Sequence, residues 1–214
     1  MTKKEKKNLM LMGILYVGSI ALYFWFVNTD FFPSFKAWSQ QNVFITITVL
    51  IFVKILGIVW PPLPGGLLTL GAIPILGWPL AYACDFVGSI IGSSIDFYIG
   101  KKYGDKFIRK IFDETTFARI HTIKVKKDKE IEATFALRLI GGNTIVEAIS
   151  YAAGHLGIKY SNFLIGTVLS HTVLGIPTYF LADNIFSTNN LGFRMALTII
   201  ALTILWKAKG RYFE

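Results

Sequence analysis

The sequence predicts an all-α, polytopic membrane protein, in which two oppositely oriented re-entrant helical hairpins form an inverted repeat beside the transmembrane helices. Of its 214 residues, 53% are hydrophobic and only 16% are charged, whereas soluble domains carry about 25% charged residues. Long uncharged runs alternate with clusters of Lys and Arg. Two of the apolar segments are interrupted by proline or glycine, a pattern typical of broken helices at membrane depth.

The basic residues gather at three places along the chain. Four lie within residues 3–7, ten within residues 101–129 and three within residues 207–211. Because Lys and Arg are retained in cytoplasmic loops, we expect both termini and the central cluster on the cytoplasmic side of the plasma membrane. The net charge of +9 does not indicate nucleic-acid binding, since the charges flank apolar runs instead of covering one face of a soluble domain. A single cysteine, Cys84, excludes a disulfide framework.

Residues 1–42 are expected to form an N-terminal anchor helix and an interfacial segment. The run 9–27 carries no charge, and about 20 such residues cross a bilayer. The lysine-rich prefix also suits a signal peptide, but the run is long for one and no A-x-A site follows it, which favours an uncleaved anchor. Phe32, Phe35 and Trp38 recur at helical spacing, which predicts a short helix lying at the outer interface.

The predicted core covers residues 43–184 and begins with a hairpin at 43–79. This segment is apolar except for Lys54 and is broken at Pro61–Gly66, where prolines cannot continue a helix. Broken backbone in a membrane must be buried in protein or face a cavity. The span 80–99 follows, and its Gly88-x-x-x-Gly92 motif permits close helix packing.

The second half of the core repeats this plan after a basic loop at 100–132. Within that loop, apolar and basic residues alternate over Phe107–Phe112. They predict an amphipathic helix, which would lie either on an anionic membrane surface or on the protein's own cytoplasmic face. A second hairpin is expected at 133–157, broken at Gly141–Asn143, and a span at 160–183.

Residues 185–214 are expected to form a last span, at 191–206, and a basic tail. If both broken segments are re-entrant, all three basic clusters lie in the cytoplasm; two full crossings would fit the charges equally well. A weak internal sequence repeat favours the hairpins. Gly65-Gly66 and Leu76-Gly77 in the first half match Gly141-Gly142 and Leu156-Gly157 in the second. Paired interrupted segments are a signature of inverted-repeat transporters.

Five motifs occur in an order that resembles a known family. They are P-x-P-G-G-L-L-T-L-G at 62–71, G-S-I-I-G-S-S-I-D-F-Y-I-G-K-K-Y-G at 88–104, F-A-L-R-L at 135–139, Y-A-A-G at 151–154 and F-L-I-G-T at 163–167. Together they resemble the DedA superfamily, the proteins with a VTT or SNARE-associated domain, over about residues 43–184. The resemblance implies two re-entrant hairpins and lipid translocation. In bacteria it implies flipping of polyprenyl-phosphate carriers or phospholipids, with proton coupling in some members.

The chain departs from the family pattern at four positions. The family often has proline at the position of Gly141, a second arginine at Thr144, and acids at Gly66 and Ser94. These differences are typical of a divergent branch, and they bear on proton coupling more than on the fold.

Arg138 is the strongest candidate for a substrate-binding residue. A charged residue inside a membrane segment is costly and usually functional, and a guanidinium binds phosphate through two parallel hydrogen bonds. The neighbouring Gly141, Gly142 and Asn143 would let a head group approach the backbone. The alternative is a structural ion pair between Arg138 and Glu147 or an aspartate.

The turn of the first hairpin and two carboxylates of the next span complete the candidate site. Pro64, Gly65 and Gly66 would form the other side of a polar groove for the substrate. Asp85 and Asp96 lie on one helical face. They could pair with the arginine, carry protons or line a polar cavity; the alternative is a packing face with Asp96 at the interface.

The remaining polar groups argue against an enzyme. Glu147 belongs with the candidates for proton or ion coupling, while His155 and His171 have no second ligand at metal spacing. No nucleophile elbow and no phosphate-binding loop occur in the sequence. We therefore expect no metal and no cofactor.

Three functions fit these observations. The first is translocation of a lipid through recognition of its phosphate head group, which makes membrane lipids the expected partners. The second is proton- or cation-coupled transport of a small solute through Asp85, Asp96 and Glu147. The third is a membrane assembly factor that transports nothing and acts through helix packing.

Overall fold

The computed structural model describes residues 18, 21–23, 25–60, 65–111, 114, 118, 125–141 and 146–187. Within these residues every regular element is a helix and no strand occurs, which confirms the predicted all-α class. Most of the predicted anchor, the predicted last span and the turns of both hairpins lie outside the described residues, as do the basic ends of the chain.

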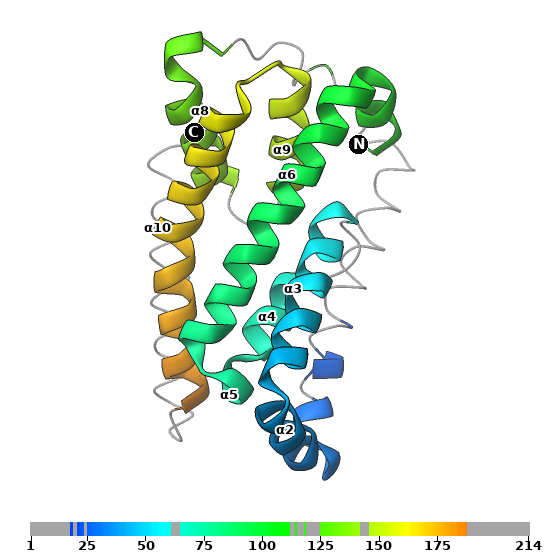
Figure 1. Cartoon of the computed structure of the whole chain (residues 1–214), viewed down its shortest axis with the longest axis vertical. Helices are drawn as coiled ribbons and strands as arrows, with labels where there is room; N and C mark the ends of the chain where they lie inside the picture. The colour runs from blue at the N-terminus through cyan, green and yellow to red at the C-terminus, as the bar shows by residue number, and fades with distance from the viewer. Residues whose placement is uncertain are drawn as a thin grey trace.

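Two long helices run along most of the molecule, α6 (Trp78–Ile111) and α10 (Tyr160–Ser187), and pack against each other (Figure 1). Their segments Trp78–Gly104 and Tyr160–Ile185 are long and apolar enough to cross a membrane, as predicted for 80–99 and 160–183. α6 continues beyond the predicted span as far as Ile111, and the segment after Gly104 includes most of the helix predicted at Phe107–Phe112. The helix bends at Gly104, which has φ 48° and ψ −134°.

The first half of the core consists of four shorter helices at one end of the molecule (Figure 1). α2 (Phe31–Gln41) is the predicted short helix, and it meets α3 (Val43–Val59) at a bend of 104°. After the break, α4 (Gly65–Gly71) packs along α3 and α5 (Ile73–Leu76) leads into α6. Two packed helices thus flank the proline-rich break, as the sequence predicted.

The second half lies at the opposite end (Figure 1). A single turn, η1 (Lys127–Lys129), precedes α8 (Glu130–Gly141), and α9 (Val146–His155) follows the glycine-rich break. α8 packs mainly on α10, and α9 packs mainly on α6. Each long helix therefore carries one arm of the second broken segment.

Glycines allow α6 to approach its neighbours closely. A Cβ on Gly88 would lie 2.7 Å from the Lys54 side chain, and one on Gly92 would lie 2.9 Å from Ile58, so the predicted G-x-x-x-G motif packs against α3. On α9, a Cβ on Gly154 would collide with the carbonyl oxygen of Phe97 in α6. The backbones of α6 and α9 are consequently in direct contact.

This contact predicts a large effect of one methyl group. Gly154→Ala should separate α6 from α9 and sharply reduce the yield of folded protein, because the added carbon meets backbone, which cannot move aside. Gly66→Ala is the matched control, since its Cβ would meet only the Lys54 Nζ at 3.6 Å, an ordinary contact. Size-exclusion chromatography in detergent measures both. Equal monodisperse yields of the two variants would contradict the contact.

The two Leu-Gly pairs that recur in the sequence both end in a glycine with positive φ. Gly77 (φ 76°) follows α5 and precedes α6, while Gly157 (φ 72°) follows α9 and precedes α10. Only glycine adopts positive φ at little cost. Each Leu-Gly pair therefore marks the same place, the turn from a short helix into a long one.

Candidate functional site

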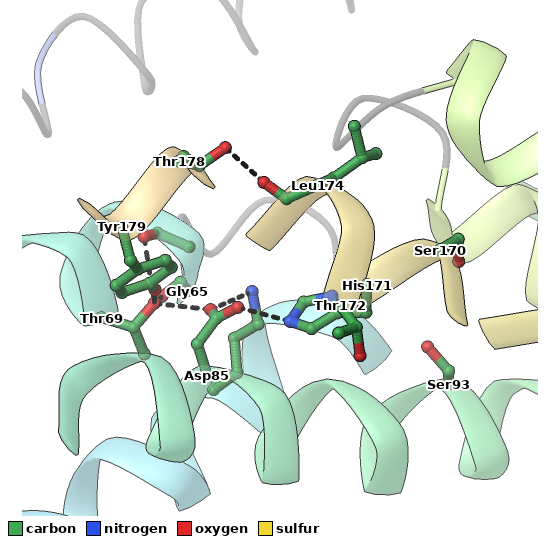
Figure 2. A network of polar contacts seen from close by, with 12 residues as sticks. Gly65, Thr69, Asp85, Ser93, Ser170, His171, Thr172, Leu174, Thr178 and Tyr179 are labelled. Atoms are coloured by element: carbon green, nitrogen blue, oxygen red, sulfur yellow. Dashed lines mark hydrogen bonds and ion pairs between the residues drawn. The ribbon is translucent and has the colours of Figure 1, made fainter. Parts of the chain in front are cut away.

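A buried polar network is centred on Asp85 of α6 (Figure 2). One carboxylate oxygen lies 2.7 Å from the Lys54 Nζ and accepts a hydrogen bond of 2.7 Å from the Thr69 hydroxyl. The other oxygen lies 2.9 Å from the His171 Nε2. The Tyr179 hydroxyl donates to the Thr69 Oγ1 at 2.8 Å. The network therefore joins α3, α4, α6 and α10.

The physical reason for this network is the cost of buried charge. Lys54 is 8% exposed and Asp85 is 4% exposed, and charges removed from water need a partner and further hydrogen bonds. Lys54 reaches Asp85 because Gly88, one turn further along α6, lets the two helices approach. A buried polar network of this kind favours one packing arrangement over others.

A small cavity of about 40 Å³ adjoins the network. A water molecule needs about 10–15 Å³ by this kind of measure, so the cavity has room for a few waters. Its lining comes from α4, α6, α8 and α10 and consists of Gly66, Leu70, Asp85, Arg138, Ser170, His171, Leu174, Gly175, Thr178 and Tyr179. Residues from both halves of the chain thus share one polar cavity.

Arg138 of α8 lines this cavity and is hydrogen-bonded to neutral groups. It is 3% exposed, and its Nη1 and Nη2 donate to the hydroxyls of Ser150 and Ser93 at 3.1 and 3.2 Å. The guanidinium carbon also lies 6.0 Å from the centre of the Phe163 ring. Within the described residues no carboxylate lies at ion-pair distance from it, so the structural pair with Glu147 or an aspartate is not formed here.

Asp96 lies deeper in the protein and does not line the cavity. It is fully buried, and neither carboxylate oxygen has a hydrogen-bond partner among the described residues. Its charged neighbours are Glu147 and Arg138. Such an orphaned buried group is rare in native proteins and calls for an explanation. Asp96 and Glu147 are therefore placed near the arginine, but not with Asp85 in the cavity.

The structure brings together only part of the predicted site. Arg138, Gly66 and Asp85 line the same cavity. Gly65 packs against α3, where a Cβ would lie 3.2 Å from the Gly57 Cα, and Gly141 is the last residue of α8. Three predicted site residues lie outside the described residues: Pro64, Gly142 and Asn143.

Several residues of the site were missed by the sequence analysis. Lys54 could have been found, because a single charge in an apolar run is a functional candidate by the same rule that selected Arg138. His171 was considered only as a metal ligand, whereas it contacts Asp85. Thr69 and Tyr179 could not be predicted as site residues, because the sequence does not indicate which group a single hydroxyl in an apolar helix contacts.

The comparison with protein families decides the identity of the core. The family model described as the VTT domain matches residues 60–183, more than half of the chain. The chain belongs to the VTT-domain family. The VTT domain is the domain of the DedA proteins. No curated protein and no solved structure matches the chain.

The VTT-domain match includes the cavity but not Lys54. All the residues that line the cavity, from Gly66 to Tyr179, fall inside the matched segment. Lys54 precedes it, so the ion pair between Lys54 and Asp85 joins the VTT domain to a helix that begins before it. The match confirms the resemblance to the DedA superfamily, and the apolar helices agree with a membrane protein of that family.

Proposed function

We propose that this protein moves a phosphate-bearing lipid, a polyprenyl phosphate or a phospholipid, between the two leaflets of the plasma membrane, and that Arg138 binds the phosphate. One observation carries the proposal. A guanidinium that is 3% exposed lines a polar cavity and has only hydroxyl partners among the described residues. A buried guanidinium with no carboxylate at ion-pair distance among the described residues can accept an anionic ligand, and the planar fork of arginine suits phosphate.

The balance of charge at the cavity supports an anion over a cation. Asp85 is the one carboxylate in the lining, and it is already held by Lys54 and His171. Glu147 and Asp96 lie near Arg138 but outside the described lining. The side of the cavity at Arg138 therefore presents a positive group, which favours a phosphate over a cation there.

The arrangement of the two broken segments also supports transport. Gly66 follows the first break and Arg138 lies three residues before Gly141, at the second break, yet both line one cavity. The Tyr151 hydroxyl of α9 donates to the carbonyl oxygen of Val59, the last residue of α3, at 3.4 Å. The helices α2–α5 and α8–α9 lie at opposite ends (Figure 1). This placement supports our proposal of an inverted repeat, in which the site lies where the breaks meet.

A cavity of 40 Å³ is closed to a head group, so transport requires it to widen. In the proposed cycle the two broken segments move apart on one side at a time. The phosphate passes Arg138 while the hydrocarbon tail stays in the bilayer. A state in which the cavity has room only for waters would separate two states that open to opposite leaflets.

Reconstitution in liposomes tests the proposal. Purified protein is incorporated with a head-group-labelled phospholipid, and a membrane-impermeant reagent bleaches the label from outside. Protein-free vesicles lose the outer half of the signal. We expect vesicles that contain the protein to lose signal well beyond that half. A bleached fraction that stays at one leaflet, with protein shown to be inserted, would contradict lipid movement.

The proposed orientation makes a separate prediction. We expect the central basic cluster, like both termini, to face the cytoplasm, because Lys and Arg resist translocation. In a Cys84→Ala background, a cysteine at the position of Lys127 should be labelled only after the cells are permeabilised. Labelling of that cysteine by an impermeant reagent on intact cells would contradict the orientation.

A second candidate function is proton- or cation-coupled transport of a small solute. It is favoured by Asp96, which is buried without a hydrogen-bond partner in the described part of the chain, and by the contact between Asp85 and His171. Buried acids of this kind can carry protons through a membrane protein. A proton flux into protein-containing vesicles without any lipid movement would support this candidate over the first.

A further inference from the structure

A second hollow lies on the outer side of α6, away from the cavity at Arg138. It is an open groove of about 650 Å³ between α6 and the start of α10, within the range of ligand pockets. Its floor is a stripe of isoleucines on α6, including Ile91 and Ile95, which are 42% and 37% exposed. Tyr160 forms the wall on the side of α10.

One end of the groove is polar and basic. Lys102, Tyr98 and Tyr103 line it there, and the Lys102 Nζ lies 5.3 Å from the centre of the Tyr103 ring. Tyrosines with an apolar body and a polar tip are typical of the level of the lipid head groups. This end is also where the central basic cluster of the sequence begins, so the groove runs from a basic, interfacial end towards the middle of the span.

The length of the groove matches one leaflet. Ile91 and Lys102 are eleven residues apart on a continuous helical segment, which is about 16 Å at the rise of an α-helix. The hydrocarbon core of a bilayer is about 30 Å thick, so one leaflet is about half of that. A single hydrocarbon chain could therefore lie along the isoleucines while its head group stays beside Lys102.

We propose that this groove is a binding site for one anionic phospholipid of the cytoplasmic leaflet, with a hydrocarbon chain on the isoleucine stripe and the phosphate at Lys102. Charge complementarity selects the occupant, because a basic end and an apolar body match an anionic lipid of the same length. The site is separate from the translocation path and holds whether or not the protein moves lipid.

The groove is connected to Arg138 through aromatic rings. Tyr98 contacts Tyr160 with ring centres 5.1 Å apart, Tyr160 contacts Phe97 at 5.4 Å, and Phe97 stacks on Phe163 at 4.8 Å. The Phe163 ring in turn faces the guanidinium of Arg138. A lipid in the groove would thus support the aromatic packing that holds the arginine.

Native mass spectrometry of the full chain in detergent tests the site with two lipids of identical acyl chains, phosphatidylglycerol and phosphatidylcholine. We expect one phosphatidylglycerol per chain to be retained in preference to phosphatidylcholine. Lys102→Gln should reduce that preference about five-fold, the effect of one basic residue near anionic lipid. Lys101→Gln is the matched control, because Lys101 is an exposed neighbour on α6 outside the groove lining, and it should leave the preference unchanged.

A second pair of variants tests the apolar part of the groove. Ile95→Trp should fill it and reduce retention of both lipids, whereas Val173→Trp, at an exposed position of α10 outside the lining, should not. Ile91→Trp replaces Ile95→Trp if the latter fails to fold. Equal losses in Lys101→Gln and Lys102→Gln would overturn the site in favour of diffuse attraction to basic residues. Unchanged lipid retention in the groove-filling variant, with loss of a dimer, would overturn it in favour of a second copy of the chain.

Discussion

Arg138→Ala is expected to reduce lipid flipping at least about 100-fold per folded molecule while the yield of folded protein stays close to that of the parent. Hydrogen bonds to a charged group are worth about 1.5–3 kcal/mol each, and a bidentate contact with phosphate loses two of them. Folding should tolerate this change better than the loss of an ion-pair partner, because the hydrogen bonds of the guanidinium go to the neutral hydroxyls of Ser93 and Ser150. Among the described residues no carboxylate lies at ion-pair distance from it.

Two further variants sharpen this expectation. Arg138→Lys keeps the charge but loses the planar fork, so flipping should fall about ten-fold, corresponding to about 1.4 kcal/mol. Arg109→Ala removes an exposed arginine that pairs with Glu114 at 3.1 Å, and it should leave the rate unchanged. If Arg138→Ala folds well and still flips lipid at the parental rate, the residue has no part in the mechanism. If Arg138→Ala instead lowers the yield of folded protein, the role of Arg138 is structural.

Asp85→Asn should behave in the opposite way and lose stability before it loses activity. The substitution keeps the shape of the side chain but leaves Lys54, 8% exposed, without its counter-charge. Breaking one side of a buried ion pair typically costs about 3–5 kcal/mol. We expect a large drop in monodisperse protein on heating in detergent, measured by size-exclusion chromatography.

Lys54 offers the rescue that distinguishes a charge effect from a packing effect. Lys54→Met combined with Asp85→Asn removes both charges at similar volume and should restore most of the lost stability. Lys54→Met alone should cost less than Asp85→Asn alone, because the Thr69 hydroxyl still donates to Asp85 and His171 remains 2.9 Å from it. A double variant as unstable as Asp85→Asn would show that the ion pair is not the cause.

The architecture of the described core was readable from the sequence because its signals are local. Apolar runs of the right length predicted α6 and α10, and the proline and glycine breaks predicted that α3 and α4, and α8 and α9, are separate helices. The span was predicted to end at Ile99 because basic residues follow it, and a short amphipathic helix was predicted separately within the basic segment. A helix leaving a membrane can continue through such residues, as α6 does to Ile111.

The site was predicted only where one residue carries its own signal. Arg138 stands out because it is a charged residue in an apolar segment. Lys54 could have been identified by the same argument. The pairing of Lys54 with Asp85, and of Arg138 with Ser93 and Ser150, depends on how α3, α6, α8 and α9 pack. Residues 12 to 45 positions apart meet in these contacts, and no spacing in the sequence encodes them.

The central claim is that the protein recognises the phosphate of a lipid while the tail remains in the bilayer. The most direct measurement compares, in the same vesicles, the flipping of two labelled lipids with identical tails, one whose head group contains a phosphate and one whose sugar head group contains none. We predict rapid movement of the phosphate-bearing lipid, little movement of the other, and loss of the difference in Arg138→Ala. Equal flipping of both lipids by the parental protein would contradict recognition of the phosphate.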